Sequence, residues 1–174
     1  MSAELERFLQ LFDALVVASN AWIEQTPDDK LDWVPFDNPS MKFGDRVSTI
    51  TIRSLYVHTL TGEKMWARML SDCGPGDQFR PEPETELTSR LMSSASLVGD
   101  AMTIHRENLD VFAAFSDARL ETPIQWVGRD WTVMGFLWGI YSHRSYHLGN
   151  IDLYLREAAA AAPDFFSTFR QTLA

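Results

Sequence analysis

The sequence of 174 residues predicts an all-α protein, an up-and-down four-helix bundle. Four long stretches repeat their apolar residues every three to four positions, which is typical of helices with one buried face. Clusters of proline and glycine separate these stretches. Apolar residues make up 45% of the chain and include 11 Phe and 6 Trp, which is enough to fill one core. We therefore expect a single helical-bundle domain over residues 1–174.

The first two helices are expected at about 3–25 and about 48–70. Ser2 is a suitable N-cap, because its hydroxyl can accept a hydrogen bond from a free N–H of the first turn. Pro27 marks the end of the first helix. The second helix stops at a Cys-Gly-Pro-Gly sequence. Residues 27–47 contain several prolines, and we expect a long loop of the kind that often forms the wall of a site.

A third helix is expected over about 85–116. Gly99 lies inside it and should weaken the helix without breaking it. The apolar stripe that predicts this helix contains Leu87, Leu91, Ala95, Val98, Met102, Leu109 and Phe112.

The end of the chain combines two kinds of pattern. Apolar and polar residues alternate around Gly128, which favours a small β-hairpin over 124–131. The fourth long helix is expected over 132–157, with Thr132 as its N-cap. Its apolar stripe runs from Val133 to Leu155, with Arg144 as the exception. A short C-terminal helix is expected over 164–173, after the proline that ends the preceding alanine-rich tract.

The net charge of −9, from 15 basic and 24 acidic residues, limits the expected partners. Nucleic-acid phosphates and anionic lipids both attract basic surfaces, so we expect neither nucleic acid nor membrane as a partner. No apolar run approaches the roughly 20 residues of a membrane span, and the first residues lack the features of a secretory signal. With a single cysteine, Cys73, these features predict a cytoplasmic protein.

Three of the four histidines lie on helix faces that we expect to be buried. His143 and His147 are four residues apart, so both rings project from one face of the last helix. His58 lies on the apolar stripe of the second helix. A divalent transition metal between the helices would bind all three rings, whereas hydrogen-bonded core histidines are the alternative. His105 lies in a polar run and is interpreted as a surface or interhelical residue.

The stretch 143–151, HRSYHLGNI, resembles the last bundle helix of the DinB superfamily, in which two histidines four apart precede Gly and then Gln or Asn. His58 matches the histidine of that family's second helix, and the resemblance covers about residues 3–157. It implies a four-helix bundle, often dimeric, and in some branches a thiol-dependent S-transferase. It also implies a three-histidine site for zinc or nickel, with ligands at His58, His143 and His147.

Three neutral ligands leave a divalent ion with an open coordination position, as in catalytic zinc sites. Such an ion can hold a low-molecular-weight thiol as thiolate for attack on a small electrophile, or activate water for hydrolysis. Hydrolysis needs a general base. Glu63 and Asp152 each follow a candidate ligand by five residues, about 140° around the helix, and are predicted to point away. Thiol transfer to a small-molecule substrate is therefore the favoured hypothesis.

Non-catalytic roles remain open, because a metal could merely tie two helices together in a binding protein or homodimer. Small-molecule chemistry would be favoured by a pocket over the metal that is lined by Trp33, Trp66, Trp126 or Trp138. A closed site would favour a structural role. Gly62 and Gly139, one turn from candidate ligands, could clear room for a ligand or permit close helix packing. Cys73 is interpreted as a helix-end residue without a chemical role.

Overall fold

The computed structural model of the chain describes residues 1–34, 49–78 and 80–161. Its four long helices are α1 (Ala3–Glu24), α3 (Ile52–Asp72), α5 (Leu97–Ala113) and α7 (Val133–Glu157). The shorter elements in the described ranges are α2 (Asp28–Leu31), α4 (Thr85–Met92), α6 (Asp117–Leu120), β1 (Pro123–Trp126) and β2 (Arg129–Thr132). The all-α bundle with a small hairpin is confirmed, whereas the C-terminal helix expected over 164–173 lies outside the described residues.

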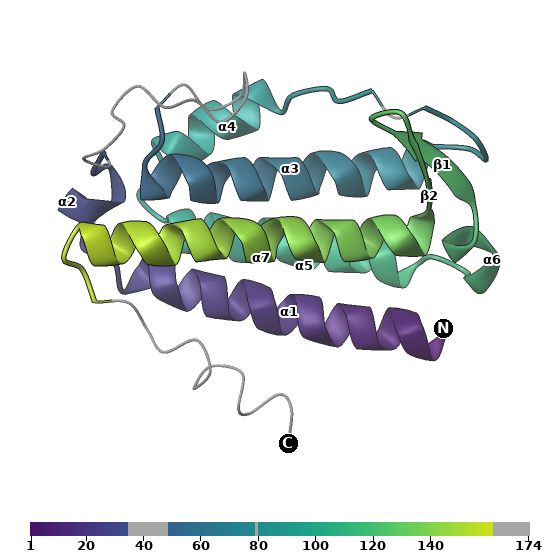
Figure 1. Cartoon of the computed structure of the whole chain (residues 1–174), viewed down its shortest axis with the longest axis horizontal. Coiled ribbons are helices and arrows are strands. Elements are labelled where there is room, and N and C mark those ends of the chain that lie inside the picture. The colour runs from purple at the N-terminus through teal and green to yellow at the C-terminus, as the bar shows by residue number, and fades with distance from the viewer. Residues whose placement is uncertain (35–48, 79, 162–174) are drawn as a thin grey trace.

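The long helices contact one another in the order α1, α5, α3, α7 and back to α1. Figure 1 shows α1 and α7 running in one direction and α3 and α5 in the other. Because α3 and α5 run the same way, the long helices do not alternate in direction as they would in a simple up-and-down bundle, and the chain between α3 and α5 must return along the bundle. The short helix α4 lies on this return and packs on α3. The connection thus adds an outer wall to one face of α3.

Side-chain caps fix the starts of three long helices. Ser2 and Thr132 each accept a hydrogen bond from the N–H three residues later, as predicted for α1 and α7. The helix α3 begins at Ile52, later than the expected start near residue 48. Thr51 and Ser54 form a capping box there, in which each side chain bonds to the other residue's N–H. The capping box therefore sets where α3 begins.

The prediction of one continuous helix over 85–116 is wrong. The chain leaves helical geometry over residues 93–96, between α4 and α5. Ser93 donates a hydrogen bond to the carbonyl of Ser89. The Ser94 hydroxyl donates to Asp100 and accepts a hydrogen bond from the N–H of Ser96. Serine hydroxyls compete with helical backbone hydrogen bonds, and several together can end a helix. Gly99, as expected, lies inside α5 without breaking it.

The predicted hairpin is present, extended by one residue at each end. Its two strands are antiparallel, with Ile124 opposite Trp131 and Trp126 opposite Arg129. The turn is made by Val127 and Gly128, whose φ angles of 52° and 72° are both left-handed. Two such residues define the tight turn that matches strand twist. The hairpin closes the end of the bundle where α7 begins (Figure 1).

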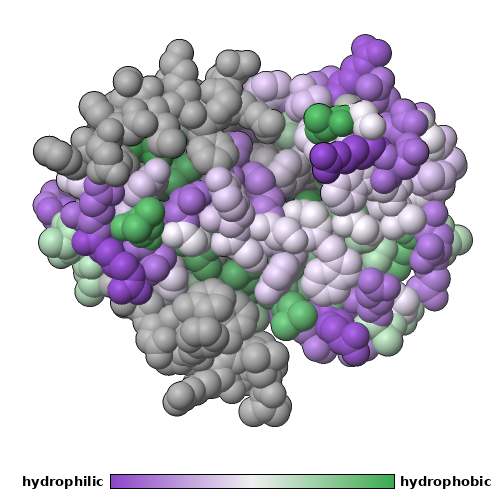
Figure 2. Space-filling view, in the orientation of Figure 1, coloured by the Kyte–Doolittle hydropathy of each residue, from purple (hydrophilic) through white to green (hydrophobic). Residues whose placement is uncertain are grey.

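Large apolar side chains from the four long helices fill the interior. Phe8 and Phe12 of α1 stack with ring centroids 5.4 Å apart, and both meet Phe112 of α5. On the face seen in Figure 2, the described surface is mostly hydrophilic or neutral, with hydrophobic residues in small separate spots. None of the helices in the described ranges has both the length and the apolar character needed to cross a bilayer.

Candidate metal centre

Three histidines meet where α3 and α7 pack together. The four-residue spacing of His143 and His147 aims both rings at α3, which carries His58. The atoms that could bind an ion all lie within 4.8 Å of one another, and the Nε2 atoms of His143 and His147 are 3.1 Å apart. Two nitrogens bound to one zinc ion at the tetrahedral angle are about 3.3 Å apart. The structure thus brings together the three residues singled out in the sequence, in a geometry that fits one ion.

The protonation of the cluster also suits a metal. His147 is buried, whereas His58 and His143 are half-buried. Burial lowers the pKa of His147 to about 4, helped by the charges of His58 and Arg144 and opposed by a hydrogen bond that the ring donates to Asn150. The His147 ring is therefore neutral at pH 7, which is the form that binds a metal. Asn150, one turn further along α7, is placed to hold the ring in position.

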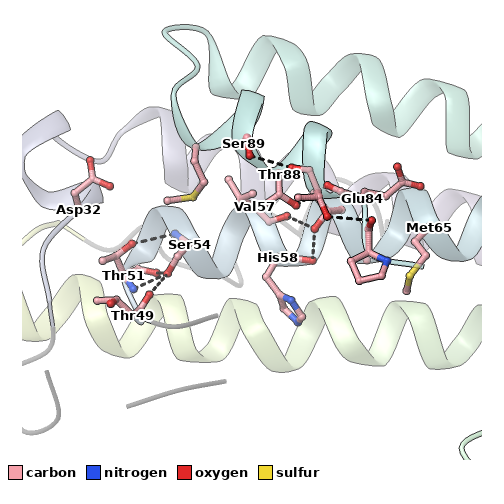
Figure 3. Close-up of a pocket in the computed structure, with 15 residues that line it drawn as sticks. Asp32, Thr49, Thr51, Ser54, Val57, His58, Met65, Glu84, Thr88 and Ser89 are labelled. Atoms are coloured by element: carbon pink, nitrogen blue, oxygen red, sulfur yellow. Dashed lines mark hydrogen bonds between the residues drawn. The ribbon is translucent and has the colours of Figure 1, made fainter. Parts of the chain in front are cut away.

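A cavity of about 490 Å³ opens beside the cluster and has His58 in its wall. It lies between α3 and the outer helix α4, as Figure 3 shows. This volume is in the range of about 300–1,000 Å³ that is typical of small-molecule sites. The lining residues of this cavity do not include the tryptophans considered from the sequence, Trp33, Trp66, Trp126 and Trp138. The cavity wall comes instead from α4, which was expected to be part of a longer helix.

Aromatic residues pack against His143. The ring of Trp66 meets that of His143 edge-on, with centroids 4.8 Å apart. Trp126 from the hairpin and Phe136 from α7 pack in turn on Trp66, at 6.3 Å and 6.0 Å. Edge-to-face aromatic contacts of this kind hold rings in fixed orientations. Through Trp126 and Trp66, the hairpin therefore supports the orientation of one candidate ligand.

A buried ion pair lies next to the cluster. Arg144, an exception in the predicted apolar stripe, donates two hydrogen bonds of 2.6 Å to the carboxylate of Glu63, and both side chains are 1% exposed. Burial opposes the charge of Arg144, but Glu63 outweighs this and raises its pKa. Burial likewise raises the pKa of Tyr56, which bonds to Asn20. The sequence signal for the pair was an arginine in an apolar stripe, which requires a buried acidic partner.

His105 and Cys73 have other partners. His105 is buried, and its Nε2 lies 2.9 Å from Asp13 of α1. The interhelical interpretation is therefore confirmed and the surface interpretation is wrong. Cys73 caps the end of α3 and accepts a hydrogen bond of 2.9 Å from Arg119. Neither residue belongs to the group of potential metal ligands found in the described part of the chain.

The chain matches one family model and resembles solved structures of the same fold. The model of the DinB superfamily matches residues 3–151. YfiT from Bacillus subtilis, described as a probable metal-dependent hydrolase with an unusual four-helix bundle topology, superposes with a TM-score of 0.67 at 15% identity, covering 92% of this chain and 91% of its own. The DinB-like protein YjoA from Bacillus subtilis gives 0.63 at 18% identity, with coverages of 91% and 96%. No curated protein sequence matches the chain significantly.

Proposed function

We propose that this chain, which belongs to the DinB superfamily, holds one divalent transition-metal ion and uses it on a small molecule. His58, His143 and His147 would be the ligands, and zinc or nickel is the expected metal. The observation that carries the proposal is the convergence of their ligand atoms within 4.8 Å, from two helices. The adjoining cavity supports a role beyond helix packing, because a purely structural site needs no chamber.

Thiol transfer is the reaction that this site supports best. A bound ion would stabilise the thiolate of a low-molecular-weight thiol at neutral pH. In the transfer, the sulfur forms a bond to an electrophilic carbon, the leaving group departs with its electron pair, and the thiol proton goes to solvent. The protein's part in this reaction is to keep His147 neutral and oriented and to hold the reactants in the cavity. Because the thiol is the nucleophile, no side chain has to act as one.

Hydrolysis is the second candidate, because YfiT is described as a probable metal-dependent hydrolase. Hydrolysis needs a general base close to the ion. Glu63 follows His58 by five residues on α3, but both of its carboxylate oxygens accept hydrogen bonds from Arg144 inside the core. Asp152 is bound by Arg156 on the surface. Neither carboxylate is available as a base, which favours thiol transfer.

The test uses untagged protein that has not been exposed to a nickel-affinity column. Plasma mass spectrometry should find about one transition-metal ion per chain, and none in a variant with all three histidines changed to Gln. The loaded protein is then given 1-chloro-2,4-dinitrobenzene with a panel of thiols, or p-nitrophenyl acetate without thiol. Metal-dependent conjugation supports thiol transfer, and metal-dependent ester cleavage alone supports the hydrolase. Absence of metal uptake would overturn both.

The remaining expectations go with this proposal. We expect a cytoplasmic homodimer that interacts with neither nucleic acid nor membrane, in keeping with the net charge of −9. Size-exclusion chromatography with light scattering tests the dimer. A DNA gel-shift assay at roughly physiological salt tests the charge argument, since basic binders still hold phosphate there.

A further inference from the structure

We propose that the cavity between α3 and α4 delivers a ligand to the histidine cluster, that Gly62 forms the passage between them, and that the cavity selects ligands that donate hydrogen bonds and carry no negative charge. The inference rests on the proposed metal site. It adds to that site a route of entry and a chemical class of ligand. Both follow from residues on and next to α3 and α4.

Gly62 lies between the cavity and the cluster. It is one turn after His58 on α3, and both residues line the cavity. A Cβ placed on Gly62 would lie 3.7 Å from the Trp66 ring and 3.9 Å from Cε1 of His143. The side chain that glycine lacks would therefore project toward the cluster, with room for a methyl group only at contact distance. Any larger side chain would occupy the space through which a ligand in the cavity reaches His143.

Four hydroxyl groups of the cavity wall are presented as hydrogen-bond acceptors. Thr61 donates its proton to the carbonyl of Val57, and Thr88 and Ser89 donate theirs to carbonyls one turn earlier on α4. Ser54 donates to the carbonyl of Thr49. Once the proton is used in this way, the oxygen has only lone pairs left for a ligand. A ligand satisfies such a wall by donating hydrogen bonds, as hydroxyl and ammonium groups do.

The charged residues of the wall also disfavour an anion. Asp32 and Glu84 line the cavity, and each pairs with an arginine, Arg53 at 2.9 Å and Arg68 at 3.2 Å. Neither arginine is among the residues that line the cavity, and none of the described lining residues is a lysine or an arginine. Figure 3 shows the carboxylates of Asp32 and Glu84 toward opposite ends of the site. Among the described lining residues an anionic group would find no cationic side chain and would meet carboxylates, so it is disfavoured.

The passage is tested with Gly62→Leu in cobalt-loaded protein. Binding of 2-mercaptoethanol is followed by thiolate-to-cobalt charge-transfer absorption, and cobalt content is measured separately. We expect unchanged cobalt stoichiometry and at least a tenfold loss in thiol affinity. Gly149→Leu is the matched control, because this α7 glycine has no neighbour within 4 Å of an added Cβ. If Gly62→Leu does not fold, Gly62→Ala replaces it, with an expected loss of two- to threefold.

The chemical class is tested with three thiols of similar size. 2-Mercaptoethanol is neutral, cysteamine is cationic, and 2-mercaptoethanesulfonate is anionic. We expect the neutral and cationic thiols to bind the cobalt protein several-fold more tightly than the sulfonate. Equal or tighter binding of the sulfonate would overturn the selectivity. Wild-type affinity in Gly62→Leu and Gly62→Ala would overturn the passage.

A metal-independent measurement separates this inference from the metal proposal. Met65 and Met92 line the cavity from α3 and α4, so their labelled methyl groups report on it in NMR spectra. We expect 2-mercaptoethanol and cysteamine to shift both signals in metal-free protein, with Met134 in the core unaffected. If cobalt does not bind but these shifts appear, the metal site fails and the cavity proposal stands. If cobalt binds and the shifts are absent, the cavity proposal fails alone.

Discussion

Arg144 of α7 and Glu63 of α3 form a two-pronged ion pair inside the bundle, with both N···O distances 2.6 Å and both side chains 1% exposed. Removing two charges from water carries a large desolvation cost, which only such geometry offsets. The pair joins the same two helices that carry the histidine cluster, and Arg144 directly follows His143 in the chain. It thereby defines how α7 sits along α3, and so how His143 and His147 face His58.

Breaking this pair should be costly, whereas replacing it should not be. Glu63→Gln leaves a buried guanidinium without its counter-charge, and we expect a loss of about 3–5 kcal/mol in the free energy of unfolding. The double variant Glu63→Leu with Arg144→Met should regain most of this loss, because well-packed apolar residues often equal a buried pair. Urea unfolding of metal-free protein, followed by circular dichroism, measures both.

The surface pair of α7 gives the control for that experiment. Arg156 binds Asp152 one turn away, and the Arg156 side chain is largely exposed. Arg156→Ala should leave the urea midpoint nearly unchanged, because exposed ion pairs contribute little to stability. A loss below about 1 kcal/mol in Glu63→Gln would contradict the view that the buried pair is structurally important.

Metal affinity should separate the clustered histidines from His105. Changing His58, His143 or His147 to Ala removes a nitrogen ligand, and we expect at least about a hundredfold loss in zinc affinity. Such a loss exceeds the 10–100-fold typical of residues that only orient a ligand. Asn150→Ala, which frees the His147 ring, should lose about tenfold. His105→Ala should bind zinc as wild type does, and competition with a chromophoric chelator measures each variant.

The stability of the metal-free protein should fall in mild acid. The pKa of His147 is about 4 in the folded chain, below its ordinary value of 6.5, so the unfolded chain binds more protons between these values. The contribution of neutral His147 to the free energy of unfolding is complete above pH 6.5 and is lost as the pH falls toward 4. Between these values the free energy of unfolding changes with pH by up to about 1.4 kcal/mol per pH unit. Burial also lowers the pKa of His105, so His105 likewise makes the folded chain less stable as the pH falls.

Urea midpoints at half-unit pH steps test this prediction. His147→Gln should reduce the slope between pH 6.5 and 4 while leaving the contribution of His105 in place. An identical slope in wild type and His147→Gln would show that His147 is not held neutral by the fold.

The hairpin turn offers a stabilising substitution. Val127 has a left-handed φ of 52° and is 76% exposed, so it carries backbone strain without compensating burial. Asn tolerates this conformation far better than a β-branched residue, for which it costs roughly 1–2 kcal/mol. We expect Val127→Asn to gain about 1 kcal/mol, which corresponds to a Tm increase of roughly 2–4 °C. Val127→Ile keeps the strain and should show no gain in the same thermal scan.

The sequence pattern predicts the structure correctly wherever residues close together in the chain determine it. The limits of α1 and α7, the caps Ser2 and Thr132, and the hairpin around Gly128 all followed from local rules. The convergence of the three histidines also followed, because a four-residue spacing and an apolar stripe set their directions. These are features in which sequence neighbours determine geometry.

The sequence was less informative where distant residues decide the structure. The apolar period runs through 93–96 without interruption, so it conceals the break made by serine hydroxyl groups. Glu63 was predicted to point away because its angle was measured from His58 alone. Its partner Arg144 lies on another helix, and only packing of α7 on α3 shows that the two meet. The cavity likewise depends on the separation of α4 from α5, which the apolar period does not indicate.

That break in the third predicted helix has a consequence for how ligand choice can change. Of the eight residues of α4, Leu91 is the one that is buried, while Thr85, Thr88 and Ser89 face the cavity. Substitutions at such positions seldom alter stability by more than about 0.5 kcal/mol. The cavity-facing residues of α4 can therefore be substituted while α3 and α7 keep the histidines in place. If the cavity binds the ligand as proposed, the α4 part of its wall can change ligand preference without disturbing the helices that hold the histidines.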